Sequence, residues 1–127
     1  MTRRLATTFD EMVDIVGAED PVALLLGWWC RIEKALAYYT IAYHGKRMRT
    51  AAHAIRVLQA DGLVSSKVIE RLHALRRKRN AVQHVEIVSV SHQEAKEFAA
   101  EAWDLGWVIG CSVPNDLAMS SGAALVA

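Results

Sequence analysis

The chain has 127 residues, 53% of them hydrophobic, and a formal net charge of only +1 at neutral pH. This length suits one domain, and the small net charge excludes a strongly basic protein that coats nucleic acid. Because prolines are few and alanine, leucine and valine abundant, the composition favours packed helices over a sheet sandwich. We therefore expect an all-α, up-and-down bundle of about four to five helices over residues 1–114, followed by a loosely held tail at 115–127.

The first third of the chain contains two helix starts. The run Thr8-Phe9-Asp10-Glu11 is typical of a capping box, which predicts a short helix over residues 9–16. Asp20 followed by Pro21 predicts the start of a long helix that ends near His44, before Gly45. Two adjacent apolar strips run along this long helix: Leu25, Trp29, Ile32, Leu36, Tyr39 and Tyr43, and beside them Leu24, Trp28, Ala35, Tyr38 and Ala42. One strip is enough for a core, so we expect the second to be covered by a neighbouring subunit or by the terminal helix.

Three further helices are predicted. Thr50 is a cap for a helix through Ala60 that ends at Asp61-Gly62, and Ser65 or Ser66 is a cap for the next. After a β-branched connector at 85–90, Ser91-His92-Gln93-Glu94 is a second capping box, for a helix to about Cys111. Its predicted inward face comprises Ala95, Phe98, Ala99, Ala102, Leu105 and Ile109, with Trp103, Trp107 and Gly110 on another side.

The helix after Ser65 carries one break in its apolar pattern. Val68, Leu72 and Leu75 share one face, and Arg79 occupies the next position on that face. A guanidinium on a core-facing stripe is costly unless it is paired or has a function. Arg79 is therefore the first candidate for a functional residue.

Two neighbours of Arg79 strengthen this interpretation. Asn80 and His84 are four residues apart and share a helix face, whereas Arg79 and His84 would diverge by about 140° on a straight helix. Arg79 and His84 can converge only if the helix ends or bends between them, or across a two-fold dimer axis. An imidazole that moves a proton and a guanidinium that grips phosphate oxygens would together suit an RNA phosphate.

The segment Arg79-Asn80-Ala81-Val82-Gln83-His84 resembles the Arg-Asn-x-x-x-His signature of HEPN domains, which are small all-helical modules. The likeness extends to Leu24–Tyr43 and to Asp61-Gly62-Leu63-Val64, but only the signature is specific. Many members are metal-independent ribonucleases, commonly dimeric, and often toxins or components of phage defence.

The resemblance implies a HEPN-like bundle and a metal-independent endoribonuclease that cleaves RNA through attack of the ribose 2′-hydroxyl. Arg79, His84 and Asn80 would be catalytic, and Arg76, Arg77 and Lys78 would bind RNA. It also implies a homodimer and a cognate antitoxin, such as a small nucleotidyltransferase, as a partner.

Other interpretations of the same residues stay open. Arg79 can form a structural ion pair with Glu33 of the long helix, and Asn80 can orient the imidazole or cap carbonyls at a helix end. Arg76, Arg77 and Lys78 can be a solvated face. The whole chain can accordingly be a non-catalytic HEPN-like module that binds a nucleotide, RNA or a protein partner, or a bundle that serves assembly alone.

No cofactor or metal is expected, because the histidines lack ligand spacing with acids or cysteines and no glycine-rich phosphate loop is present. Cys30 and Cys111 lie in apolar surroundings and are expected to be buried thiols in a reducing cytosol. Charges at Arg31, Glu33 and Lys34 argue against a membrane helix over residues 21–43, so we expect a cytoplasmic protein.

Overall fold

The computed structural model describes residues 13, 19–84 and 89–113. Those residues form four helices and no strand: α2 (Pro21–His44), α3 (Ala51–Asp61), α4 (Ser66–His84) and α5 (His92–Cys111). The predicted all-α helical bundle is confirmed. The predicted helix over residues 9–16, except Val13, lies outside the described residues, as do most of the connector and the tail at 115–127.

Local capping chemistry defines the ends of the helices, as the sequence predicts. The Oδ1 atom of Asp20 accepts a hydrogen bond from the Ala23 amide at 3.0 Å, and the Oγ atom of Ser65 accepts one from the Val68 amide at 3.2 Å. The hydroxyls of Thr50 and Ser91 accept equivalent bonds at the starts of α3 and α5. At the ends of α2 and α3, Gly45 and Gly62 both have a φ of 70°, a left-handed conformation that residues with a Cβ rarely adopt.

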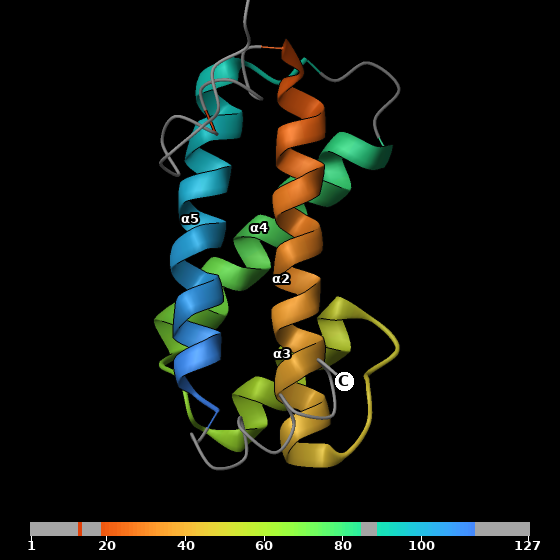
Figure 1. The fold of residues 1–127 in the computed structure, drawn as a ribbon, viewed down its shortest axis with the longest axis vertical. Helices are drawn as coiled ribbons and strands as arrows, with labels where there is room; N and C mark the ends of the chain where they lie inside the picture. The colour runs from red at the N-terminus through yellow and green to blue at the C-terminus, as the bar shows by residue number, and fades with distance from the viewer. Residues whose placement is uncertain (1–12, 14–18, 85–88, 114–127) are drawn as a thin grey trace, which may run out of the picture.

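Helices α2 and α5 lie side by side and run in the same direction, with α4 crossing behind them (Figure 1). Contacts at two levels fix this parallel arrangement. Trp28 meets Trp103 edge to face, with ring centroids 5.8 Å apart, and the Tyr43 hydroxyl donates to the Ser112 carbonyl oxygen at 2.9 Å. The second apolar strip of α2 is therefore covered in part by α5.

The core lies where α2, α3, α4 and α5 meet. From α2 and α5 it takes the side chains predicted from their periodicity, including Leu25, Ile32, Leu36, Ala99, Leu105 and Ile109. Helix α4 contributes Ile69, Leu72 and Leu75, whereas Val68, predicted to face inward, is only partly buried. Burial of this apolar surface holds the four helices together.

Ion pairs join α4 to α5 on the outside of the bundle. Arg71 donates to the carboxylates of Glu101 and Asp104, and Lys78 lies 2.6 Å from Glu94. Hydrogen bonds to Glu101 and Asp104 raise the pKa of Arg71 above its usual value, and the bond from Lys78 lowers the pKa of Glu94. Two of the cations near the signature are therefore neutralised by α5.

Cys30 and Cys111 are free thiols, as expected, but both are exposed, because each lies on the outer side of its helix. Within the part of the chain that the structure describes, no helix has the length and apolarity that crossing a membrane requires.

Candidate functional site

Arg79 is half-buried on α4, one turn beyond Leu75 on the face that reaches the core. Its Nη1 atom donates a hydrogen bond to Oδ1 of Asn80 at 3.1 Å. Asn80 therefore holds the guanidinium, rather than orienting the imidazole of His84 or capping a carbonyl as expected from the sequence. A guanidinium fixed by a neutral amide keeps its full charge available for an anion.

The Arg79 side chain opens onto a cavity of about 420 Å³, which we call the arginine pocket. Helices α2, α3 and α4 all contribute to its wall. The residues that line it are Trp29, Glu33, Arg49, Thr50, Ala51, Ala52, Arg76, Arg79 and Asn80. The pocket thus gathers three arginines from two segments that are far apart in the sequence.

None of the three arginines in the pocket forms an ion pair with a described carboxylate. Every ion pair within 4.0 Å in this part of the chain involves other cations, namely His44, Arg71 and Lys78. The Nε atom of Arg76 is buried and has no hydrogen-bond partner. Three guanidinium groups without a counter-ion among the described residues are an arrangement suited to phosphate, whose oxygens accept bidentate hydrogen bonds from arginine.

The N-terminus of α3 also faces the arginine pocket through Thr50, Ala51 and Ala52. The Thr50 hydroxyl satisfies the amide of His53, but the first amides of a helix have no carbonyl partner within it. The first turn of α3 contains no acidic residue, so the positive end of the helix dipole is not neutralised locally. These amides and the arginines favour the same kind of ligand, an anion.

One carboxylate, Glu33, lies in the same pocket. The ion pair between Arg79 and Glu33 that the sequence allowed as an alternative is not formed, since no nitrogen of Arg79 is within 4.0 Å of a described carboxylate oxygen. Glu33 lowers the positive potential of the pocket without neutralising any one arginine.

His84 does not reach the arginine pocket. It is the last residue of α4, it is exposed, and it makes no hydrogen bond to another described residue. Because α4 continues as a helix from Arg79 to His84, the two side chains point about 140° apart. The prediction that Arg79 and His84 converge through a bend in the helix is therefore wrong for a single chain. The remaining possibility is convergence across a two-fold axis between two chains.

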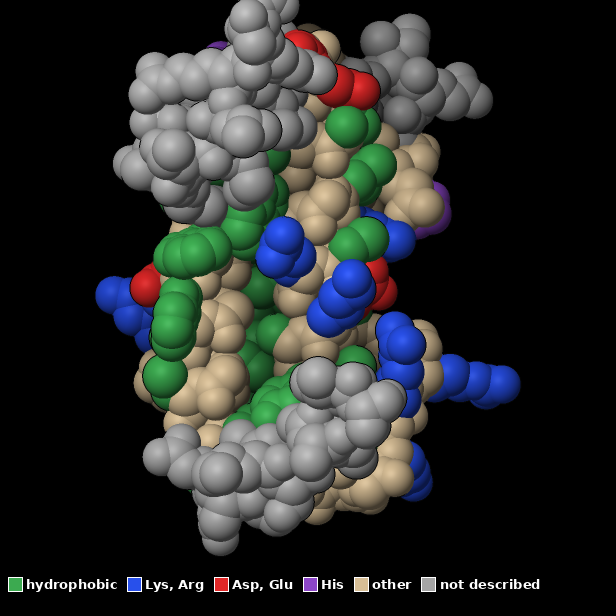
Figure 2. All heavy atoms as spheres, in the orientation of Figure 1, with side chains coloured by type: hydrophobic (Ala, Val, Ile, Leu, Met, Phe, Trp, Pro, Cys, Tyr) green, Lys and Arg blue, Asp and Glu red, His purple; other side chains and the backbone are tan. Residues whose placement is uncertain are grey.

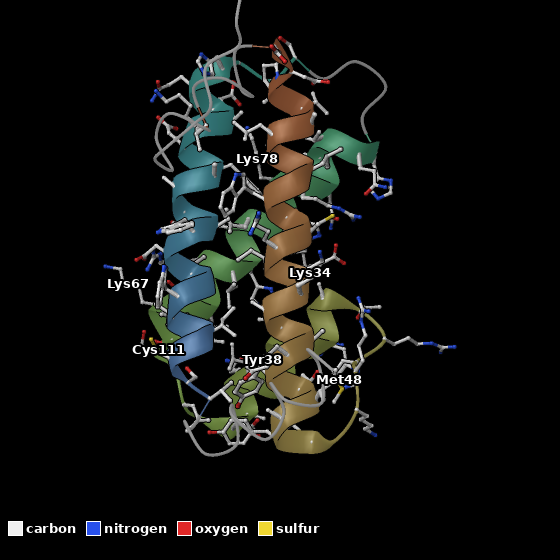
Figure 3. All side chains as sticks on the ribbon, in the orientation of Figure 1. Lys34, Tyr38, Met48, Lys67, Lys78 and Cys111 are labelled. Carbon is white, nitrogen blue, oxygen red and sulfur yellow. The ribbon has the colours of Figure 1, made fainter. Side chains whose placement is uncertain are left out.

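The three predicted RNA-binding residues lie on different sides of α4. Arg76 lines the arginine pocket, Arg77 is exposed to solvent, and Lys78 is paired with Glu94 toward the start of α5 (Figure 3). Successive residues of a helix point about 100° apart, so a run of three cations cannot act as one patch.

Arg49 and the N-terminus of α3 were not predicted to join Arg79. A partial signal was present, since Arg49 belongs to a cluster of basic residues just before the Thr50 cap. The pKa of His73 is lowered, first by burial of the imidazole and then by the positive charges of Arg76, Arg77 and Arg56.

A second polar cluster, also not predicted, lies at the opposite end of α3. The Oδ2 atom of Asp61 accepts a hydrogen bond from the Tyr39 hydroxyl at 2.7 Å and lies 2.8 Å from Nε2 of His44. Burial and the Asp61 carboxylate raise the pKa of Tyr39. Burial also acts to raise the pKa of Asp61, but the hydrogen bonds to Tyr39 and His44 outweigh this effect and lower the pKa of Asp61. This cluster ties the ends of α2 and α3 together.

Across residues 13, 19–84 and 89–113, no three side chains of His, Cys, Asp or Glu come together as a metal site. Comparison of the chain with protein-family models, curated proteins and solved structures finds no match in any of the three.

Proposed function

We propose that this protein is a HEPN-like endoribonuclease that cleaves RNA without a metal ion. The observation that carries the proposal is the arginine pocket: Arg79, on a core-facing stripe and without a described carboxylate partner, shares an open cavity with Arg49 and Arg76. A phosphodiester is the anion that fits this set of donors, and the HEPN-like signature around Arg79 supplies the link to RNA.

In the proposed reaction the ribose 2′-hydroxyl attacks the adjacent phosphorus, and the bond from phosphorus to the 5′-oxygen breaks. Arg79, with Arg49 and Arg76, stabilises the charge that accumulates on the non-bridging oxygens. His84 takes the proton of the 2′-hydroxyl, and a solvent water supplies the proton that the leaving 5′-oxygen gains. The products are a 2′,3′-cyclic phosphate and a free 5′-hydroxyl. DNA lacks the attacking hydroxyl and would not be cleaved.

The active unit of this proposal is a homodimer. Since Arg79 and His84 of one copy diverge, the histidine that serves one arginine pocket would come from a second copy. Exposure of His84 at the end of α4 leaves its imidazole available to a neighbouring chain. A role as a toxin or defence component, held in check by an antitoxin such as a small nucleotidyltransferase, is the biological setting suggested by the resemblance.

The second candidate function is a non-catalytic module that binds a nucleotide, RNA or a protein partner. It is favoured by the position of His84 outside the arginine pocket, because an anion site needs only the arginines and the amides of α3. In that case the pocket binds phosphate and no bond is broken.

Cleavage of labelled total RNA in excess EDTA tests the proposal. We expect cyclic-phosphate ends from the wild type, and a loss of rate of about a hundred-fold or more in both Arg79→Ala and His84→Ala. Arg56→Ala is the control, because Arg56 is an exposed arginine that does not line the arginine pocket. Folded wild-type protein that binds RNA but leaves it intact would favour the second candidate.

A further inference from the structure

In the groove between α2 and α5 the indoles of Trp103 and Trp107 are partly exposed to solvent. Figure 2 shows hydrophobic side chains along α5 and in the furrow beside α2. This part of the groove is a cavity of about 580 Å³ lined by residues that include Trp28, Arg31, Trp103, Gly106, Trp107 and Gly110. Trp103 is 44% exposed and Trp107 is 61% exposed. Open space surrounds Gly106 and Gly110 at the position of a Cβ, so the glycines leave room beside both rings.

Cations follow this groove along α2. A second cavity, of about 460 Å³, shares Gly110 with the first and is lined by Lys34, Tyr38 and Arg47. In Figure 3 Tyr38 is labelled between α2 and α5, and Lys34 is labelled higher along α2. Arg31 has its guanidinium carbon 5.0 Å from the centre of the Trp28 ring.

Lining residues shared between neighbouring cavities link the groove to the arginine pocket. A small cavity shares Ala37 and Arg47 with the second cavity, and it shares Glu33, Arg49, Thr50 and Ala51 with the arginine pocket. The cations along this path, which we call the cation track, are Arg31, Lys34, Arg47, Arg49, Arg76 and Arg79. None of them is ion-paired to a carboxylate within the described ranges.

We propose that a single strand of RNA lies along the cation track, with bases stacked on Trp103 and Trp107 and phosphates leading to Arg79. The inference rests on the proposed function and assigns it a substrate class, single-stranded RNA. Stacking on exposed aromatic rings beside a positively charged groove is how proteins bind single strands without strict sequence preference. A duplex cannot use the indoles, because its bases are already stacked and paired.

The number of cations along the track favours RNA over an apolar helix from a protein partner. A helix docked in an apolar groove needs hydrophobic anchors and few cations, whereas the track presents six cations and a single carboxylate, Glu33. A nucleic-acid backbone carries one negative charge per nucleotide and can engage such a row of cations in sequence.

Binding of a fluorescein-labelled 2′-O-methyl oligouridine to the wild-type protein tests the inference without cleavage, because this strand lacks the 2′-hydroxyl. We expect Trp107→Ala and Trp107→Leu to weaken binding about ten-fold, and Trp107→Phe to bind nearly as the wild type, because only phenylalanine retains a ring for stacking. At 61% exposure, Trp107 can be replaced without opening a hole in the core. Equal affinity of Trp107→Leu and the wild type would overturn the stacking assignment.

Salt dependence tests the phosphate contacts. Arg47→Ala should reduce the slope of log affinity against log salt by about 0.7, the contribution of one phosphate contact in a single strand. Arg56→Ala is the matched control, since Arg56 is an exposed arginine on α3 outside the track. If Arg47→Ala and Arg56→Ala have the same effect, the path of the strand is wrong.

Cleavage kinetics on natural single-stranded RNA separate this inference from the nuclease proposal. We expect Trp107→Ala and Arg47→Ala to raise KM and leave kcat unchanged. If the wild type cleaves RNA and neither variant changes KM, the track is refuted while the nuclease stands. If the oligouridine binds through the track and no RNA is cut, the track stands and the nuclease is refuted. Absence of any RNA binding refutes both.

Discussion

The two sides of α4 carry the same kind of residue in different electrostatic settings. On the side toward α5, Arg71 and Lys78 are neutralised by Glu101, Asp104 and Glu94. On the side toward α2 and α3, Arg76 and Arg79 enter a pocket and have no described counter-ion. The difference teaches that local sequence makes a helix basic, but its neighbours decide which cations hold the fold and which are left for a ligand.

Replacing Arg79 should produce the largest effect on activity. Arg79→Ala is expected to lower the rate of RNA cleavage about a hundred-fold or more, because it removes a donor aimed at developing phosphate charge. The free energy of unfolding should change by less than about 1 kcal/mol, since Arg79 forms no ion pair with a described carboxylate. Cleavage rates and urea denaturation measure the two quantities. If the loss of stability equals the loss of activity when both are expressed as free energies, Arg79 is a structural residue.

Replacing Arg71 should give the opposite pattern. Arg71→Ala is expected to lower the free energy of unfolding by about 1–2 kcal/mol, because Glu101 and Asp104 lose their common partner at a partly exposed site. The affinity for RNA should not change. Urea denaturation and RNA titration check this, with Arg56→Ala as the exposed arginine control. Weaker RNA binding by Arg71→Ala would show that the ligand surface extends toward α5.

The Asp61 cluster tests how much the hydrogen bonds at the far end of α3 stabilise the fold. Asp61→Asn should cost about 1–2 kcal/mol at neutral pH, because Tyr39 and His44 lose a charged acceptor. Burial alone would raise the pKa of Asp61, but those two bonds lower it below that of an unfolded aspartate, about 3.9. The stabilisation is therefore present above about pH 3.9 and lost as the pH falls through the lower, folded pKa.

Urea denaturation of wild type and Asp61→Asn at neutral and acidic pH measures this contribution. The two proteins should become equally stable in acid, and Glu70→Gln, at an exposed carboxylate, should show no such change. A difference between wild type and Asp61→Asn that persists in acid would contradict the assignment.

The smallest predicted effect is a gain of RNA affinity on removing the carboxylate from the pocket. Glu33→Gln should strengthen binding of the 2′-O-methyl oligouridine about two- to five-fold at low salt, because a negative charge near three arginines repels phosphate. Glu70→Gln is the control for a general change in net charge. Weaker binding by Glu33→Gln would mean that Glu33 positions an arginine rather than opposing the ligand.

The sequence predicts the features of this molecule that depend on local interactions. Capping by Asp20, Thr50, Ser65 and Ser91 involves atoms within three residues, so the helix starts were predictable. The position of Arg79 on a core-facing stripe follows from the same periodicity and is confirmed by its partial burial.

The rest of the candidate site depends on how the helices pack. Glu94 neutralises Lys78 from sixteen residues away, and Arg49 reaches the arginine pocket from a loop thirty residues before Arg79. The periodicity of the sequence predicts neither of these contacts. The expected burial of Cys30 and Cys111 failed for a related reason, because apolar neighbours in sequence do not determine which side of a helix is covered.

Mixing two inactive variants tests the account most directly. If one copy supplies Arg79 and the other His84, Arg79→Ala and His84→Ala should each be inactive, and their mixture should recover about a quarter of the wild-type cleavage in EDTA. Half of the dimers then contain one copy of each variant, and one of the two sites in each of these mixed dimers is intact, which leaves a quarter of the wild-type sites. A mixture as inactive as its components, beside an active wild type, would contradict the shared site, and an inert wild type would contradict the nuclease itself.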